Sequence, residues 1–304
     1  MIGFGKRGER RWRRIRRRDM PEIEGILFDQ ERYCVGAASR YLDTGSPRGW
    51  VFRESGALFP APLAGMCANM PADVSAGVPA LILNSHHSLF PILCGDAGIP
   101  FPPFMQRMLR SFPLHTVQGL RRDVEFLEEG IAALGREPVD RFDYDLMTLD
   151  QEPRTEAFGR APPGLVLRQP GTADTEELFA LQAAYEMEEV LPAGAVFNPA
   201  ASRLNLARIL AEGQILAAEL DGRVVGKINT SAVSFTRCQI GGVYVHPGCR
   251  AMGIGRRMTA EFARKLIRQG RGVSLFVKKR NAAARRVYLG IGFETVGDYR
   301  ISYY

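Results

Sequence analysis

The segment from Ile240 to Arg256 constrains this chain most, because it predicts a strand, a glycine-containing turn and the start of a helix. Its first part is apolar and rich in β-branched residues, and Pro247 ends it. Gly253 and Gly255 in the turn let a ligand approach the backbone closely. The first N–H groups of a helix lack partners inside the helix and lie at the positive end of its dipole. The segment therefore predicts a binding site for a phosphate or pyrophosphate.

Basic residues are concentrated at the N-terminus of the chain. The net charge is +7 at pH 7, and residues 1–18 hold nine Lys and Arg residues against one acid. This local charge of +8 leaves the other 286 residues with a sum of −1. We therefore expect a nearly neutral folded body and a solvated basic arm over residues 1–20. The alternative is an arm that binds RNA, acidic lipid or an acidic protein, and nucleic acid is considered as a partner only through this arm.

The cysteines and histidines predict no metal centre. The cysteines are odd in number, widely spaced and without a CxxC pair: Cys34, Cys67, Cys94, Cys238 and Cys249. Such a pattern indicates neither a zinc site nor a disulfide framework, and it favours the reducing cytoplasm. Adjacent His86 and His87 leave a metal site open as an alternative to structural or surface histidines, but neighbours in an extended chain point apart.

No membrane association is expected either. Apolar runs are too short to span a bilayer. No apolar region follows the basic N-terminus, as it would in a secretory signal.

The length of 304 residues predicts two domains. Residues 150–163 are polar and proline-rich and predict a linker. We therefore expect the basic arm over residues 1–20, an N-terminal domain over residues 21–155 and a C-terminal domain over residues 165–304. The first of these domains is expected to contain helices at 25–42, 105–112 and 121–134 and strands at 49–53, 79–84, 115–117 and 142–149, with residues 57–58 and 63–66 as the antiparallel partner of strand 49–53.

The second half has the clearer pattern. Asp221 and Gly222 predict a hairpin, and apolar residues four apart from Ile254 to Leu266 predict an amphipathic helix. The expected strands are 165–168, 214–220, 223–229, 238–245, 273–277, 293–296 and 299–302, and the expected helices are 175–190, 199–213, 254–269 and 281–290. The first half has a loosely parallel order of elements, which suggests a degenerate copy of the second.

Residues 165–304 resemble the GNAT superfamily of acyl-CoA-dependent N-acyltransferases. That family carries Gln/Arg-x-x-Gly-x-Gly/Ala after a strand, and the residues here are Arg250, Ala251, Met252, Gly253, Ile254 and Gly255. A second motif of the family is matched in spacing by Asn281, Ala284, Tyr288 and Phe293. The resemblance implies an α/β (mixed α+β) fold with a central mixed, mostly antiparallel sheet flanked by helices. It also implies two tandem GNAT-like domains, of which the N-terminal one is degenerate.

The resemblance implies acetyl-CoA as cosubstrate and no metal. The residues implied in binding it are Val243, Tyr244, Val245, Arg250, Ala251, Met252, Gly253, Ile254, Gly255, Arg256, Asn281 and Ala284. The loop would hold the pyrophosphate and the strand edge the pantetheine amides, while Gly241 and Gly242 would permit a bulge.

Three residues are candidates for proton transfer. Tyr288 matches the family's general acid, which would protonate the leaving thiolate; the alternative is a core tyrosine. The apolar stripe of helix 175–190 ends in Glu188 and Glu189, so either is a candidate base, directly or through water. The alternative for this pair is a solvated helix end.

These features together predict an acetyl-CoA-dependent N-acetyltransferase. An amine would attack the acyl thioester directly, and the amine could belong to a small molecule or be linked to a protein or tRNA. The alternative is a CoA-binding regulatory or sensor protein with vestigial turnover. Acyl chain length and oligomeric state stay open.

Overall fold

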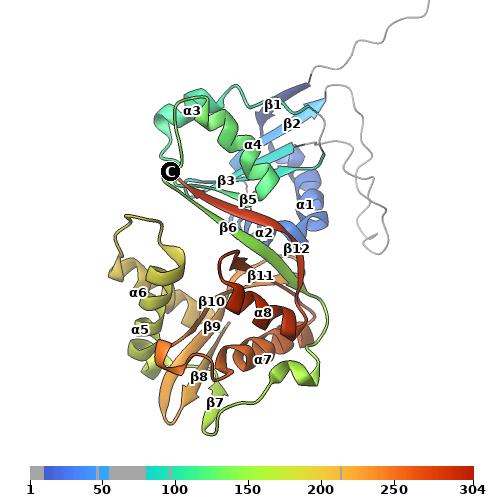
Figure 1. The fold of residues 1–304 in the computed structure, drawn as a ribbon. Helices are drawn as coiled ribbons and strands as arrows, with labels where there is room; N and C mark the ends of the chain where they lie inside the picture. The colour runs from blue at the N-terminus through green and yellow to red at the C-terminus, as the bar shows by residue number, and fades with distance from the viewer. Residues whose placement is uncertain (1–9, 46–47, 55–79, 96–97, 213) are drawn as a thin grey trace, which may run out of the picture. The chain divides into compact units, whose positions relative to one another are not determined.

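The computed structural model describes residues 10–45, 48–54, 80–95, 98–212 and 214–304. The chain forms two compact units (Figure 1). Unit 1 contains the residues up to Asp143 together with Tyr299–Tyr304, and unit 2 contains Tyr144–Asp298. Within the described residues, no helix combines the length and the apolar character needed to cross a membrane.

Unit 2 has a mixed, mostly antiparallel sheet in the order β6-β11-β10-β9-β8-β7, with only β10 and β11 parallel. Its strands are β6 (Asp140–Leu149, from Tyr144 on), β7 (Leu165–Arg168), β8 (Ile215–Leu220), β9 (Arg223–Val233), β10 (Arg237–Val245) and β11 (Gly272–Lys278). Its helical segments are η2 (Thr155–Phe158), η3 (Thr172–Asp174), α5 (Thr175–Tyr185), η4 (Glu186–Val190), α6 (Pro199–Glu212), η5 (Pro247–Cys249), α7 (Ile254–Arg268) and α8 (Ala282–Ile291).

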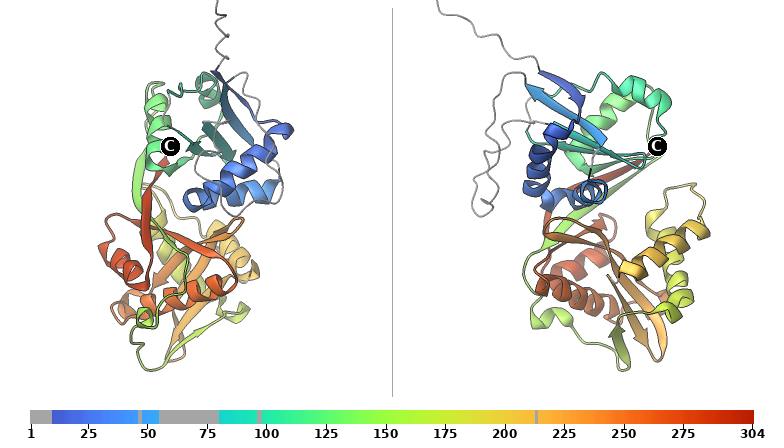
Figure 2. Two further views of the ribbon diagram at one scale, coloured as in Figure 1. Left: turned by 90° about the vertical axis from the view of Figure 1, so that its right-hand side faces the viewer. Right: turned by 180° about the vertical axis from the view of Figure 1, so that it is seen from behind.

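Helices cover both faces of this sheet: α7 and α8 lie on one side and α5 and α6 on the other (Figures 1 and 2). The predicted stripe of α7 is confirmed, since Ile254, Met258, Phe262 and Leu266 are all buried in the core. On the other face, Leu178 and Leu181 of α5 pack with residues of β8, β9 and β10. The sheet and the start of α7 are thus held in place by apolar packing.

Unit 1 repeats this plan with the strand order β1-β2-β3-β4-β5-β12. Its elements are β1 (Arg10–Arg14), η1 (Arg17–Asp19), α1 (Met20–Asp29), α2 (Glu31–Thr44), β2 (Arg48–Glu54), β3 (Ala80–Ser85), β4 (Ser88–Leu93), α3 (Met105–Ser111), β5 (Thr116–Leu120), α4 (Arg121–Ala132) and the end of β12 (Glu294–Tyr303). Here β4 and β5 are the parallel pair. Helices α1 and α2 lie on one face and α3 and α4 on the other (Figures 1 and 2).

The last strand predicted in each half pairs in the other unit. Residues Tyr144–Leu149 of β6 pair with β11 in unit 2, and Tyr299–Tyr303 of β12 pair with β5 in unit 1. The two strands predicted at 293–296 and 299–302 are one continuous strand, β12. The C-terminal end of the chain therefore completes the sheet of unit 1.

Several sequence-based expectations in unit 1 were wrong. Residues 10–14 are not part of a solvated arm: they form β1, because Trp12 is buried against Phe52 and the strand pairs with β2. The helix expected at 25–42 is two helices, α1 and α2. Strand β4 was not predicted. The partner segments expected at 57–58 and 63–66 lie outside the described residues, as do residues 1–9.

His86 and His87 form the turn between β3 and β4, both with positive φ. No cluster of three or more His, Cys, Asp or Glu residues suited to a metal occurs in the described ranges.

Candidate functional site

The two parallel strands of unit 2 separate part-way along their length. Their ladder pairs Arg237–Ile240 with Gly272–Leu275 and goes no further, although both strands continue. On the other side of β10, the His246 N–H donates to Val225 O of β9 at 2.8 Å. Because alternate residues of a strand present their N–H groups to opposite edges, that of Val245 faces the edge that β11 leaves. This edge is the one on which the pantetheine was expected to bind.

A bulge lies at this separation, at the glycines expected to permit one. Between the pairs Gly241–Asn229 and Tyr244–Lys227, β10 has two residues where β9 has one. Gly242 takes a φ of +58°, and an added Cβ there would lie 2.2 Å from Asn229 Oδ1 and 2.6 Å from Lys227 Nζ. Only glycine therefore fits at position 242.

In the part of the chain that the structure describes, the loop after β10 has backbone N–H groups without hydrogen-bond acceptors at the start of α7. The N–H of Arg257 donates to Gly253 O at 3.0 Å, but the N–H groups of residues 251–256 have no acceptor among the described residues. Gly253 caps α7 with a φ of +80°, and Ala251 is also left-handed at +64°. These donors lie at the positive end of a 15-residue helix and fit a pyrophosphate.

The side chain of Arg250 is held by the end of helix η4. Its Nη2 donates to Glu188 Oε2 at 2.8 Å, its Nε donates to Val245 O at 3.2 Å, and its guanidinium lies over the Tyr244 ring. The Tyr244 hydroxyl donates to the same Glu188 oxygen at 3.0 Å. The hydrogen bond from Arg250 lowers the pKa of Glu188, which makes this carboxylate a weaker base.

Three other loop residues have different surroundings. Arg256 donates to the carbonyls of Ala157, Glu156 and Gly290 at 2.7–3.2 Å, so its backbone N–H rather than its side chain is open to a ligand. Ile254 is buried in the core, whereas Met252 is 43% exposed.

Glu189 contacts the second motif through Asn281. Its carboxylate lies 3.4 Å from Lys278 Nζ and 3.5 Å from Asn281 Nδ2. Asn281 caps α8, because its Oδ1 accepts from the Ala284 N–H at 3.0 Å. This cap explains the spacing of the two residues in the sequence. Segment η4, which carries both glutamates, is a π-helical turn, a form frequent at functional sites.

Tyr288 is buried beside this cluster, 7% exposed, with its ring packed edge-on against Phe293. Burial raises the pKa of its phenol, and the neighbouring Tyr185 and Glu189 raise it further. The phenol therefore keeps its proton at neutral pH and can serve as a donor rather than a base.

Two residues that the sequence analysis missed also belong to this site. Lys227 is fully buried, and its Nζ lies 3.1 Å from both Gly242 O and Asn229 Oδ1. Its Nζ lies over the ring of Tyr185, whose hydroxyl accepts from the Gly242 N–H. Burial lowers the pKa of Lys227 to about 7. The signal in the sequence was the lone lysine in the apolar run Val224–Ile228.

Residues 175–293 match the family model described as the acetyltransferase (GNAT) family. This segment is a GNAT domain. No curated protein sequence matches the chain. Among solved structures, a GCN5-related N-acetyltransferase from Sphaerobacter thermophilus is 17% identical with a TM-score of 0.56, over 96% of this chain and 94% of that one. A tandem GNAT protein from the clavulanic acid biosynthesis pathway is 12% identical with a TM-score of 0.55, over 97% and 98%.

A Drosophila protein is 10% identical with a TM-score of 0.61, over 97% of this chain and 99% of its own. At these identities the likeness is one of fold, and it confirms the predicted fold class. GNAT proteins transfer acyl groups from acyl-CoA, and membership of the family supports N-acyltransferase activity for the domain at residues 175–293.

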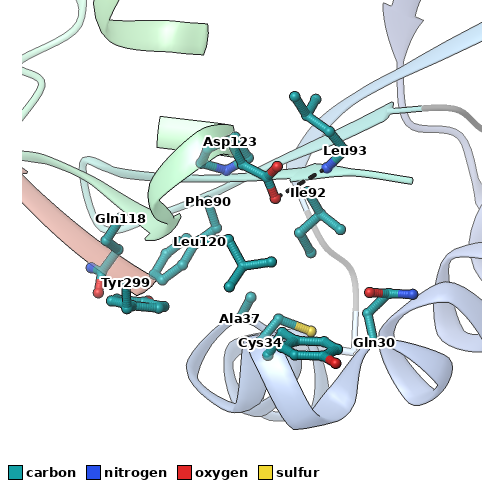
Figure 3. Close-up of a pocket in the computed structure, with 13 residues that line it drawn as sticks. Gln30, Cys34, Ala37, Phe90, Ile92, Leu93, Gln118, Leu120, Asp123 and Tyr299 are labelled. Carbon is teal, nitrogen blue, oxygen red and sulfur yellow. Dashed lines mark hydrogen bonds between the residues drawn. The ribbon is translucent and has the colours of Figure 1, made fainter. Parts of the chain in front are cut away.

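Unit 1 has a pocket at its own strand separation, between β4, β5 and α2 (Figure 3). Its volume of about 20 Å³ suits a single water molecule rather than a cosubstrate. Asp123 faces it and accepts the Leu93 N–H at 3.3 Å. Burial raises the pKa of the Cys34 thiol, which keeps this thiol protonated and unreactive. This pocket is therefore too small for an acyl-CoA, and its thiol is not a reactive nucleophile.

Proposed function

We propose that the protein is an acetyl-CoA-dependent N-acetyltransferase that transfers the acyl group to an amine by direct attack. The acceptor amine belongs to a small molecule or is linked to a protein or tRNA. The observation that carries the proposal is the run of uncommitted N–H groups at residues 251–256, beside the open edge of β10. A pyrophosphate joined to an amide-containing arm matches these two features in order.

In the proposed binding mode, the backbone of the loop Arg250–Arg256 holds the pyrophosphate. The edge residues Val243, Tyr244 and Val245 pair with the amides of the pantetheine arm. Arg250 adds a positive charge at the mouth of the loop, at present shared with Glu188. Asn281 and Ala284 contribute the start of α8, the second helix of the site.

In the proposed reaction, a base first removes a proton from the acceptor ammonium. Glu188 or Glu189 is the candidate base, directly or through water, and the lowered pKa of Glu188 makes that carboxylate a weaker base. The free amine then forms a bond to the acyl carbon as the carbon–sulfur bond breaks. Tyr288, which its raised pKa keeps protonated, donates its proton to the leaving sulfur.

The remainder of the chain is proposed to be a degenerate GNAT-like copy, over residues 21–155 in the division suggested by the sequence. The matching strand order of unit 1, including its one parallel pair, supports this. The cytoplasm is the proposed location.

The test is to incubate the protein with acetyl-CoA and a panel of amines and to measure the release of CoA thiol. Tyr288→Phe should lower kcat about 10² fold, a typical size for loss of a general acid, and leave the affinity for acetyl-CoA unchanged. Tyr33→Phe, in helix α2 of unit 1, is the matched control and should have no effect.

The possible outcomes separate the alternatives. Full turnover in Tyr288→Phe would remove that residue from the mechanism. Binding of acetyl-CoA without turnover of any amine would instead favour a CoA-binding regulatory protein. A chain that binds no acetyl-CoA would contradict both.

A further inference from the structure

A lysine with no solvent exposure lies beneath the bulge of the GNAT domain. Lys227 comes from the middle of β9 and points to the face covered by α5, under the ring of Tyr185. Burying an ammonium group is costly unless its donors are satisfied. Here they are taken by Gly242 O and Asn229 Oδ1, both neutral acceptors, rather than by a carboxylate. Because burying Lys227 in this way is costly, we infer that the group to which it is hydrogen-bonded matters for function.

What Lys227 holds is the peptide group between Gly242 and Val243. The carbonyl of this peptide accepts from Lys227 Nζ at 3.1 Å, and its N–H belongs to Val243. Because the peptide is trans, that N–H points opposite to the carbonyl and so away from Lys227. The preceding N–H, that of Gly242, is taken by the Tyr185 hydroxyl. The bulge is therefore held from the α5 face by Lys227 and Tyr185, and the Val243 N–H points to the opposite side.

The fit around the lysine is close enough to exclude a loosely placed side chain. An added Cβ on Gly242 would lie 2.6 Å from Nζ, so the amino group lies directly against the backbone of the bulge. Asn229 is fixed in turn, because its Nδ2 donates to Thr230 O at 2.9 Å. These hydrogen bonds together restrict the orientation of the peptide.

We propose that Lys227 is a positioning residue for acyl transfer, which aims the Val243 N–H at the carbonyl oxygen of the bound thioester. The proposal rests on the proposed function. A donor fixed before the reaction stabilises the charge that develops on this oxygen during attack, without the cost of reorientation. Lys227 does so through the peptide and touches neither substrate.

The test uses acetyl-CoA labelled with ¹³C at the acyl carbonyl, bound to the full chain and observed by isotope-edited infrared spectroscopy. It needs no acceptor. A directed N–H lowers the carbonyl stretching frequency of the bound label below that of the free label. In Lys227→Met at least half of this shift should be lost, while the affinity for acetyl-CoA stays within about threefold because the loop at residues 251–256 is untouched. Lys279→Met, a lysine that binds Asp145 and Asp298, is the charge-matched control and should keep the full shift.

A kinetic test compares the effect of the same substitution on kcat with its effect on KM for acetyl-CoA. Once an acceptor amine is known, Lys227→Met should lower kcat about tenfold or more and leave KM for acetyl-CoA nearly unchanged, as expected for loss of a transition-state donor.

The outcomes are distinct. A folded Lys227→Met variant that binds acetyl-CoA with the wild-type carbonyl frequency overturns the inference and leaves the proposed function standing. A wild-type chain that binds no acetyl-CoA overturns the proposed function. If Lys227→Met does not fold, Lys227→Gln decides: its amide donor is one atom shorter, so the inference expects a frequency between those of wild type and free label, and the full wild-type shift overturns it.

Discussion

Units 1 and 2 each have the same arginine–aspartate ion pair between the first strand and the first helix. In unit 1, Arg13 of β1 forms a bidentate ion pair with Asp19, with both N–O distances 2.6 Å. Asp19 also accepts a hydrogen bond from the Arg16 N–H. In unit 2, Arg168 of β7 pairs with Asp174 at 2.6 and 2.9 Å, and Asp174 accepts the N–H of Gly171. The arginine precedes the aspartate by six residues in both. The pairs match bond for bond and support an internal duplication.

The units diverge at the loop after the fourth strand of each. In unit 2 this loop has Gly253 and Gly255 and leads into a helix of 15 residues. In unit 1 it has Pro100, Pro102 and Pro103, which carry no N–H, and it leads into a helix of seven residues.

Side chains of unit 1 also fill its loop region. The Trp12 indole N–H donates to Pro100 O at 2.7 Å, and Phe104 stacks on Trp50 with ring centroids 4.4 Å apart. Phe101 packs so closely on α4 that an added Cβ at Gly130 would lie 1.9 Å from its ring. The same plan therefore leaves backbone donors free in unit 2, where an anion site is proposed, and has an apolar core in unit 1, where proline and aromatic residues replace them.

The largest expected effect is on the loop of unit 2. Gly253→Val places a branched side chain at a φ of +80° with its Cβ 2.9 Å from Arg160 O. The start of α7 must then shift, and loss of one or two charge-assisted hydrogen bonds should weaken acetyl-CoA binding by about 2–3 kcal/mol, roughly 30- to 150-fold. Isothermal titration calorimetry measures this change.

Gly270→Ala is the matched control, since Gly270 also has a positive φ, +76°, but no neighbour within 4 Å of an added Cβ. It should cost about 1 kcal/mol of stability and leave binding unchanged. Equal affinity in Gly253→Val and wild type would contradict the assignment of the donor loop.

A second change tests the filled loop of unit 1. Gly130→Ala drives a methyl group into the Phe101 ring and should lower the free energy of unfolding by about 1–3 kcal/mol, as overpacking does. Acetyl-CoA affinity should not change. Gly25→Ala, in α1 with open space around it, is the control and should be neutral or slightly stabilising. Denaturant unfolding gives the stabilities, and a loss of affinity in Gly130→Ala would mean that unit 1 takes part in binding.

The smallest expected effect concerns the arginine–aspartate ion pair that both units contain. The hydrogen bond from Arg168 lowers the pKa of Asp174 from 3.8 to about 2. A carboxyl group with a lowered pKa stabilises the fold above its unfolded pKa, and this contribution is lost as pH falls through the folded value. Because the pair is partly solvated, Asp174→Asn should cost only about 0.5 kcal/mol at pH 7. The difference from wild type should vanish between pH 4 and pH 2, and a difference that persists at pH 2 would show that it has another cause.

Local patterns made unit 2 predictable. The α7 stripe, the Asp221–Gly222 hairpin and the two motifs depend on neighbours a few residues apart, and each was found in its expected element. Unit 1 was harder because its signals conflict. Arginines on both sides of Trp12 concealed a strand, and Pro91 in β4 argued against one. Only pairing with β2 and β3, respectively, overrides these local preferences.

The sequence by itself determined where the donor loop lies, because glycines after a strand and before a helix leave N–H groups free through local geometry alone. It also determined the caps and the apolar faces of the helices that frame this loop. The tertiary structure decided which side chains meet there. Arg250 finds Glu188 at a distance of 62 residues along the chain, and Lys227 reaches the bulge from the neighbouring strand. Such partners depend on strand register and on burial, and these are set by the packing of the whole unit rather than by any short stretch of sequence.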